Sequence, residues 1–289
     1  MSRSLAPFLT LLLTLPLAAA YSGRDLVLPV VGRSAGGDGR LYDTSLWITN
    51  LSLRHQADVT LAFYESGQKN PKPRAIRLRI AAGATWLADR MDSALTGGKA
   101  MGAVRVTSSE DVIATARTYS RMANESNARA VASAFAAIPT QFAIGNGETT
   151  TMQGILSRDS RYKLYLVEVT GEPLALTASL LDPNGRSLAE KPLYIDAQMH
   201  LASDIHTLFG DAIPEHALLR ITGMNGDGRV VVAAAQIATE SQDASAYEMT
   251  FRTAPRNRMS GGEVVAYSLA AFAVLAAVLR RAARKALDA

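Results

Sequence analysis

The feature of this sequence that most constrains its fold is an internal duplication. When residues 142–250 are written beneath residues 26–140, segments with strand-like alternation fall into step. Internal self-similarity of this kind indicates one structural unit used twice. We therefore expect two tandem domains, over residues 26–140 and 141–251.

Each copy contains short alternating segments that are separated by turns. Residues 45–50 of the first copy match residues 162–169 of the second, and residues 59–64 match residues 176–181. Residues 76–80 read Ile-Arg-Leu-Arg-Ile, which places three apolar side chains on one strand face and two arginines on the other. Short strands with turn signals about every 8–12 residues predict an all-β fold, here two antiparallel β-sandwiches.

Both copies are predicted to end in a helical segment and then a hairpin. Residues 86–91 and 201–209 have helical spacing, and turn-rich loops divide the apolar segments within residues 103–119 and 218–237. The small apolar tract at residues 131–138 is expected either to return to the first domain as a strand or to pack as a linker.

These segments resemble a tandem immunoglobulin-like β-sandwich domain of bacterial extracellular proteins of unknown function. The resemblance covers about residues 26–250, and its pieces are Leu26–Val31, Thr49–Ser52, Gly102–Thr107 and the Gly147-Glu-Thr149 start of the second copy. The second copy lacks the asparagine of the Thr49–Ser52 stretch. The resemblance implies an adhesive or scaffolding part at the surface or in the periplasm, and it assigns no reaction.

The N-terminus has the pattern of a secretory signal peptide. Residues 1–20 combine the positive charge of Arg3, an apolar run and a small-residue site, Ala18-Ala19-Ala20. We expect export through the secretion machinery and cleavage by signal peptidase after Ala20. The alternative is an uncleaved N-terminal anchor.

The C-terminus has the pattern of a membrane anchor. Residues 264–279 carry no charge over sixteen residues, and an arginine cluster follows them. A linker at 252–263 is expected to lead into a transmembrane or sorting helix at 264–281, and the basic tail at 282–289 should stay in the cytoplasm. The alternative is an amphipathic helix that packs on the domain.

Ser260-Gly261-Gly262, followed by an apolar run and arginines, resembles the GlyGly-CTERM type of bacterial sorting signal. The resemblance covers about 30 residues and implies cleavage near Gly261 and Gly262 by a rhomboid-type membrane protease. Glu263 follows the glycines directly and the chain continues beyond the arginines, so a permanent anchor remains the first interpretation.

The distribution of charge argues against a nucleic-acid partner. The formal net charge is +4, and residues 252–289 hold seven basic residues against two acidic ones. The rest of the chain is therefore slightly acidic and lacks the basic surface that nucleic acid requires. The absence of cysteine excludes disulfides, cysteine-based zinc sites and a thiol nucleophile.

The weak metal candidates are His200, Asp204 and His206. On a helix, His200 and Asp204 would share a face, but His206 would not, and a catalytic zinc ion requires three convergent ligands. The simpler interpretation is that Asp204 caps or ends a turn and both histidines are solvated. Asn225–Gly228 lacks the spacing of a calcium loop and is better explained as a turn. No cofactor is expected.

The leading expectation is a non-catalytic cell-envelope protein that holds residues 21–260 outside the cytoplasmic membrane. It would scaffold or bind an envelope protein or polymer. One alternative is a periplasmic assembly chaperone, which an exposed edge strand beside a paired basic cleft would support. A less favoured alternative is an envelope hydrolase, since no Gly-x-Ser-x-Gly motif is present.

Overall fold

The computed structural model describes residues 21–35, 39–91, 93–122, 130–155, 160–210, 213–239 and 244–249. These residues belong to one compact unit that spans residues 1–250. The predicted signal peptide and the predicted C-terminal anchor lie outside the described residues. The division into two separate domains stays a prediction.

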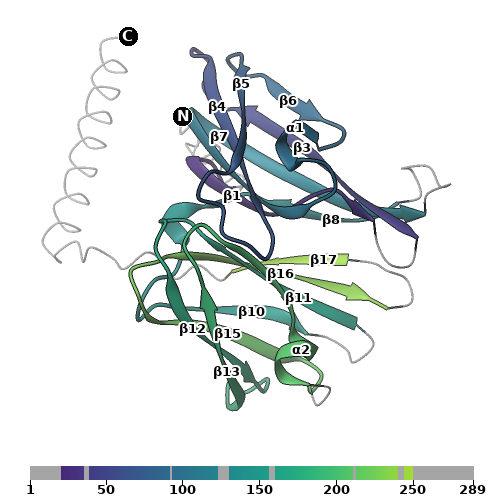
Figure 1. Ribbon diagram of the computed structural model, residues 1–289, viewed down its shortest axis with the longest axis vertical. Coiled ribbons are helices and arrows are strands. Elements are labelled where there is room, and N and C mark those ends of the chain that lie inside the picture. The colour runs from purple at the N-terminus through teal and green to yellow at the C-terminus, as the bar shows by residue number, and fades with distance from the viewer. Residues whose placement is uncertain are drawn as a thin grey trace, which may run out of the picture. The chain divides into compact units, whose positions relative to one another are not determined.

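Antiparallel strands make up most of the described chain (Figure 1). The first repeat is defined as β1 to β9 with α1, and its elements are β1 (Gly23–Gly32), β2 (Ser34–Ala35), β3 (Arg40–Asn50), β4 (Ala57–Glu65), β5 (Arg74–Ile80), β6 (Thr85–Ala88), α1 (Ser93–Thr96), β7 (Met101–Met122), β8 (Val131–Ala136) and β9 (Ile138–Pro139). A short 3-10 helix, η3 (Thr140–Phe142), follows. The second repeat comprises β10 (Thr149–Ile155), β11 (Ser160–Glu168), β12 (Leu174–Leu181), β13 (Ser187–Ile195), β14 (His200–Asp204), α2 (Ile205–Phe209), β15 (Ala217–Asn225), β16 (Val230–Ala238) and β17 (Ala244–Glu248).

In the first repeat, one long strand, β7, belongs to both layers of the sandwich. The N-terminal half of β7 lies between β1 and β4, with β5 beyond β4. Its C-terminal half lies between β3 and β8, with β6 on the other edge of β3. The two layers built on these halves face each other across a shared core. This core includes Leu28, Ile48, Leu61, Val104 and Ala114. Because β7 links them, the described strands of this repeat form one nine-stranded sheet.

In the second repeat, the described strands form two separate four-stranded sheets. Their orders are β10-β15-β12-β13 and β14-β11-β16-β17. Alternate residues on the facing strands are buried, among them Leu164, Leu176, Leu219 and Val232. This is the alternation expected when each sheet turns one face toward a shared core.

The two repeats have the same strand order. The neighbours β1-β7-β4-β5 of the first repeat correspond to β10-β15-β12-β13 of the second, and β6-β3-β7-β8 correspond to β14-β11-β16-β17. The fold is therefore all-β, antiparallel and sandwich-like, as the sequence predicts. Its assignment to the immunoglobulin-like type stays a prediction.

The predicted hairpin over residues 103–119 is wrong. Strand β7 continues through residues 108–111, where its register with β1 shifts between the pairs Gly23–Val112 and Asp25–Thr107. An irregularity of this kind bends a strand and increases its twist, which carries β7 from one sheet face to the other.

The second predicted hairpin, over residues 218–237, is wrong for a related reason. Strands β15 and β16 follow each other in the chain but lie in different sheets. The turn between them contains Gly226 at φ +119, and a Cβ there would come within 2.4 Å of the Pro173 carbonyl oxygen. Turn residues mark where a chain changes direction, but they do not show whether the next strand pairs with the previous one.

The helical prediction is wrong for residues 86–91 and holds only in part for residues 201–209. Residues 85–88 form β6, which pairs with β3, and α1 begins at Ser93. Residues 200–204 form β14, which pairs with β11, and α2 begins at Ile205. Pairing at a sheet edge overrides the helical spacing of these short segments. The tract at 131–138 returns to the first repeat as β8, which pairs with β7.

Candidate functional site

The three weak metal candidates do not converge in the structure. His200 and Asp204 stand at the two ends of β14, and positions four apart on a strand are separated by about 13 Å. Asp204 caps α2, since its Oδ1 accepts a hydrogen bond from the His206 amide at 2.9 Å. Among the described residues, no group of three His, Asp or Glu side chains can hold a metal ion.

His200 is buried rather than solvated, contrary to the expectation from the sequence. Only 2% of the residue is exposed, and its ring stacks on Tyr165 with centroids 6.1 Å apart. Burial lowers the pKa of His200 to about 4, so the ring is neutral at pH 7. A neutral ring that donates from Nε2 to the Pro29 carbonyl, 3.0 Å away, joins the second repeat to the first.

The remaining candidates lie outside the described part of the chain. Ala20, Gly261 and Gly262, as candidate processing sites, cannot be placed, and neither can the predicted helix at 264–281. None of the described helices is long and apolar enough to cross a membrane.

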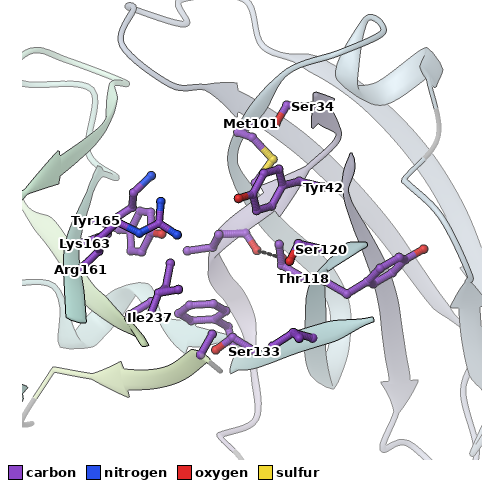
Figure 2. Close-up of a pocket in the computed structure, with 16 residues that line it drawn as sticks. Ser34, Tyr42, Met101, Thr118, Ser120, Ser133, Arg161, Lys163, Tyr165 and Ile237 are labelled. Carbon is purple, nitrogen blue, oxygen red and sulfur yellow. Dashed lines mark hydrogen bonds between the residues drawn. The ribbon is translucent and has the colours of Figure 1, made fainter. Parts of the chain in front are cut away.

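A cavity of about 340 Å³ lies between the two repeats (Figure 2). Its walls come from β1, β2, β3, β7 and β8 of the first repeat and from β11, β16 and β17 of the second. Its volume falls in the range of small-molecule sites. Because both repeats supply walls, neither repeat forms this cavity alone.

Strand β11 builds one wall by ordinary strand alternation. Tyr162 and Leu164 turn into the core of the second repeat, while Arg161, Lys163 and Tyr165 turn the other way and line the cavity. In Figure 2 these three side chains extend from one strand toward Tyr42 and Met101 of the first repeat.

The facing wall is rich in hydroxyl groups. Thr118 and Ser120 of β7 lie beside Ser133 of β8, which is the register partner of Thr118. The Thr118 hydroxyl donates to the Val30 carbonyl at 3.0 Å. Ser133 is 7% exposed, and its Oγ has no hydrogen-bond partner among the described residues.

The base of the cavity is apolar. Val30, Phe135, Tyr165 and Ala235 form a buried cluster that both repeats contribute to. The rings of Phe135 and Tyr165 meet edge to face, with centroids 6.2 Å apart at 86°. Burial raises the pKa of Tyr165, so its hydroxyl stays protonated at neutral pH.

The charged side chains of the lining are all positive. They are Arg161 and Lys163, and the described lining contains no Asp, Glu or His. Asp204 is the register partner of Lys163 across the strand pair, but Lys163 makes no ion pair with a described carboxylate. The cavity therefore combines an apolar base, neutral hydroxyls and a lining whose charged side chains are cationic.

The sequence alone does not predict this site. The available signal was the pattern Arg161-Tyr-Lys-Leu-Tyr165, which puts two cations and an aromatic ring on the non-core face of a strand.

Comparisons with known proteins identify no family for this chain. No family model and no curated protein matches it. It aligns with a protein of the T13 IBDV viral particle at TM-score 0.17 and 11% identity, over 80% of this chain and 70% of that one. It aligns with a glycosyl hydrolase family 2 member from Bacteroides cellulosilyticus DSM 14838 at TM-score 0.15 and 10% identity, over 77% of this chain and 27% of that one. At these TM-scores, neither similarity supports an argument about fold or function.

Proposed function

We propose that this chain is a non-catalytic cell-envelope protein that presents its two β-sandwich repeats outside the cytoplasmic membrane. The repeats bind or scaffold a surface component. The observation that carries the proposal is the cavity between the repeats, since a paired arrangement that builds a lined cavity has a direct use in binding.

The chemistry of the lining favours binding over catalysis. Acid–base and nucleophilic mechanisms need a base within hydrogen-bond reach of the reacting group. The serines that line the cavity have no histidine or carboxylate beside them among the described lining residues. His200 contacts Pro29 and Tyr165 and does not line the cavity.

The location is proposed from the two ends of the sequence. Residues 1–20 have the pattern of a signal peptide, and the uncharged run at 264–279 precedes a basic cluster. Together they support a location with the repeats on the outer side and the C-terminus in the cytoplasm.

Fractionation of cells combined with intact-mass measurement of the native chain tests this proposal. We expect a chain that begins at residue 21, either in the membrane fraction and ending at residue 289 or at the surface and ending near Gly262. A matched variant, Ala18→Phe with Ala20→Phe, should retain the N-terminal segment and its mass. A cytosolic chain with both ends intact would contradict the proposal.

A periplasmic assembly chaperone is the second candidate, and two features bear on it. Arg161 and Lys163 supply the paired basic cleft that this function would use. The neighbouring edge strands β8 and β17 contact each other, however, and the Ala136 amide hydrogen-bonds to the Glu248 carboxylate between them. Edge addition of a client strand at this place would have to separate them.

A further inference from the structure

The positive charge in the cavity is the first of three features that define a ligand. Lys163 faces the cavity without a described ion-pair partner, and Arg161 lies beside it two residues away on the same strand face. A desolvated cation attracts an anion more strongly in a concave site of low polarity than at an open surface. The ligand should therefore carry a negative charge at this end.

The apolar base is the second feature. Val30, Phe135 and Ala235 are each at most 5% exposed, and together with Tyr165 they form one cluster beneath the cavity. Aromatic edges and aliphatic side chains favour a flat or short apolar body over a hydrated sugar or a phosphate chain.

The buried Ser133 hydroxyl is the third feature, and it is independent of the charge. A buried hydroxyl without a partner is unfavourable unless something supplies the missing hydrogen bond. Ser133 lines the cavity, so a polar atom of a bound molecule can supply that bond.

From these three features we infer that the cavity binds a small monocarboxylate with an aromatic or short alkyl body. Lys163 and Arg161 supply the opposite charge for the carboxylate, and the Ser133 hydroxyl donates to one of its oxygens. The apolar body packs on the Val30, Phe135 and Ala235 cluster. This inference rests on the proposed binding function and names its ligand class. It requires no covalent step, because ion pairing and packing alone hold the ligand.

Calorimetric titration of the full chain in a neutral maltoside detergent at pH 7 tests the inference. The probes are 2-naphthoate, 2-naphthalenemethanol and 2-naphthylmethylammonium, which share one ring system and differ in charge. We expect one-to-one binding of the naphthoate, at least tenfold weaker binding of the alcohol, and no binding of the cation. This comparison uses the unaltered chain, so it does not depend on how any variant folds.

Matched variants locate the site. Lys163→Met should weaken naphthoate binding at least tenfold, and Lys163→Arg should largely preserve it. Lys191→Met removes the same charge from an exposed position on β13 and should leave binding unchanged. Ser133→Ala should weaken binding while the free protein stays folded.

Three results would overturn the inference. They are the absence of naphthoate binding at millimolar concentration, equal binding of all three probes, and equal effects of Lys163→Met and Lys191→Met. Binding of an extended peptide with a free C-terminal carboxylate, without naphthoate binding, would instead favour the chaperone function. Fractionation tests location independently, so a failed titration with a chain found in the envelope removes only the ligand assignment.

Discussion

Asn50 and Glu168 occupy equivalent positions in the two repeats, and each side chain forms hydrogen bonds to the backbone of neighbouring loops. Asn50 donates these hydrogen bonds, whereas Glu168 accepts them. Each is the last residue of its strand and pairs with a valine of the neighbouring strand, Val112 or Val230. The side-chain Nδ2 of Asn50 donates to the backbone carbonyls of residues 55, 80 and 81. The Glu168 carboxylate accepts from the backbone amides of residues 170, 171 and 198. The duplicated fold keeps this connection although the second copy has lost the asparagine.

Replacing Glu168 with glutamine should destabilise the second repeat. Glu168 is fully buried, and a side-chain NH2 in place of one carboxylate oxygen would face an amide donor. A lost charge-assisted hydrogen bond and an unpaired donor together cost about 2–3 kcal/mol. Urea unfolding of Glu168→Gln should show this loss, whereas Glu172→Gln, at an exposed position nearby, should change the unfolding free energy by less than about 0.5 kcal/mol. Equal effects would show that the carboxylate does not hold the loops.

Ser133→Ala should stabilise the protein while it weakens ligand binding. The substitution removes a buried hydroxyl that has no described partner, and such a group costs about 1–3 kcal/mol. We expect the unfolding free energy to rise by only about 1 kcal/mol, because the small cavity left by the hydroxyl offsets part of the gain. Ser187→Ala, at an exposed position, serves as the control. A loss of stability in Ser133→Ala would mean that the hydroxyl already has a partner in the free protein.

Stability should fall on acidification in a way that depends on His200. The pKa of His200 is lowered to about 4 in the folded protein, against about 6.5 when unfolded. Between these values the unfolded chain binds a proton that the folded chain does not, so stability decreases as the pH falls from 6.5 to 4 and levels off below it. The total effect is about 3 kcal/mol at most.

Unfolding experiments on the wild type and His200→Gln at pH 7 and pH 4.5 isolate this contribution. The wild type should lose about 2 kcal/mol more than the variant between the two pH values. Burial raises the pKa of Glu248, so protonation of this carboxylate stabilises the folded protein as the pH falls. This contribution is common to the wild type and His200→Gln, and it cancels when the change in the variant is subtracted from the change in the wild type. His55→Gln, with a side chain 70% exposed, should behave as the wild type does. Parallel profiles for wild type and His200→Gln would contradict the prediction.

Arg105→Ala should weaken the connection between the repeats. The guanidinium binds both Asp25 carboxylate oxygens, at 2.8 and 2.7 Å, and donates to the Val169 carbonyl at 2.8 Å. The loss of a half-buried bidentate pair with an added backbone bond should cost about 2 kcal/mol in unfolding free energy. The exposed pair of Arg79 and Asp58, at 3.4 Å, provides the matched comparison, and Arg79→Ala should cost less than about 0.5 kcal/mol. Similar losses in both variants would show that Arg105 contributes no more than a surface ion pair.

The sequence predicts the fold class because the relevant signal is local. Alternation in residues 76–80 and the recurrence of matching segments in the two copies depend on neighbouring residues alone. The pairing of β7 with four different strands depends on residues far along the chain, so the local pattern at 108–111 wrongly predicts a hairpin loop.

The cavity was not predictable for a similar reason. Arg161, Lys163 and Tyr165 acquire their role only when the outer face of β11 lies against the first repeat. His200 shows the same limit, since its burial depends on Pro29, which is 171 residues away in the sequence. Periodicity shows which face of a strand is polar, but it does not show what covers that face.

The contrast between β7 and the pair β15 and β16 has a mechanical consequence. In the first repeat, a continuous backbone joins both layers, so separating the layers requires breaking strand pairs on β7 itself. In the second repeat, the two layers share no described strand, so sliding one layer past the other would disturb the core between them without breaking a described strand pair. Lys163 therefore lies on β11, in the repeat whose layers share no described strand, and Ser133 lies on β8, in the repeat whose layers are joined by β7.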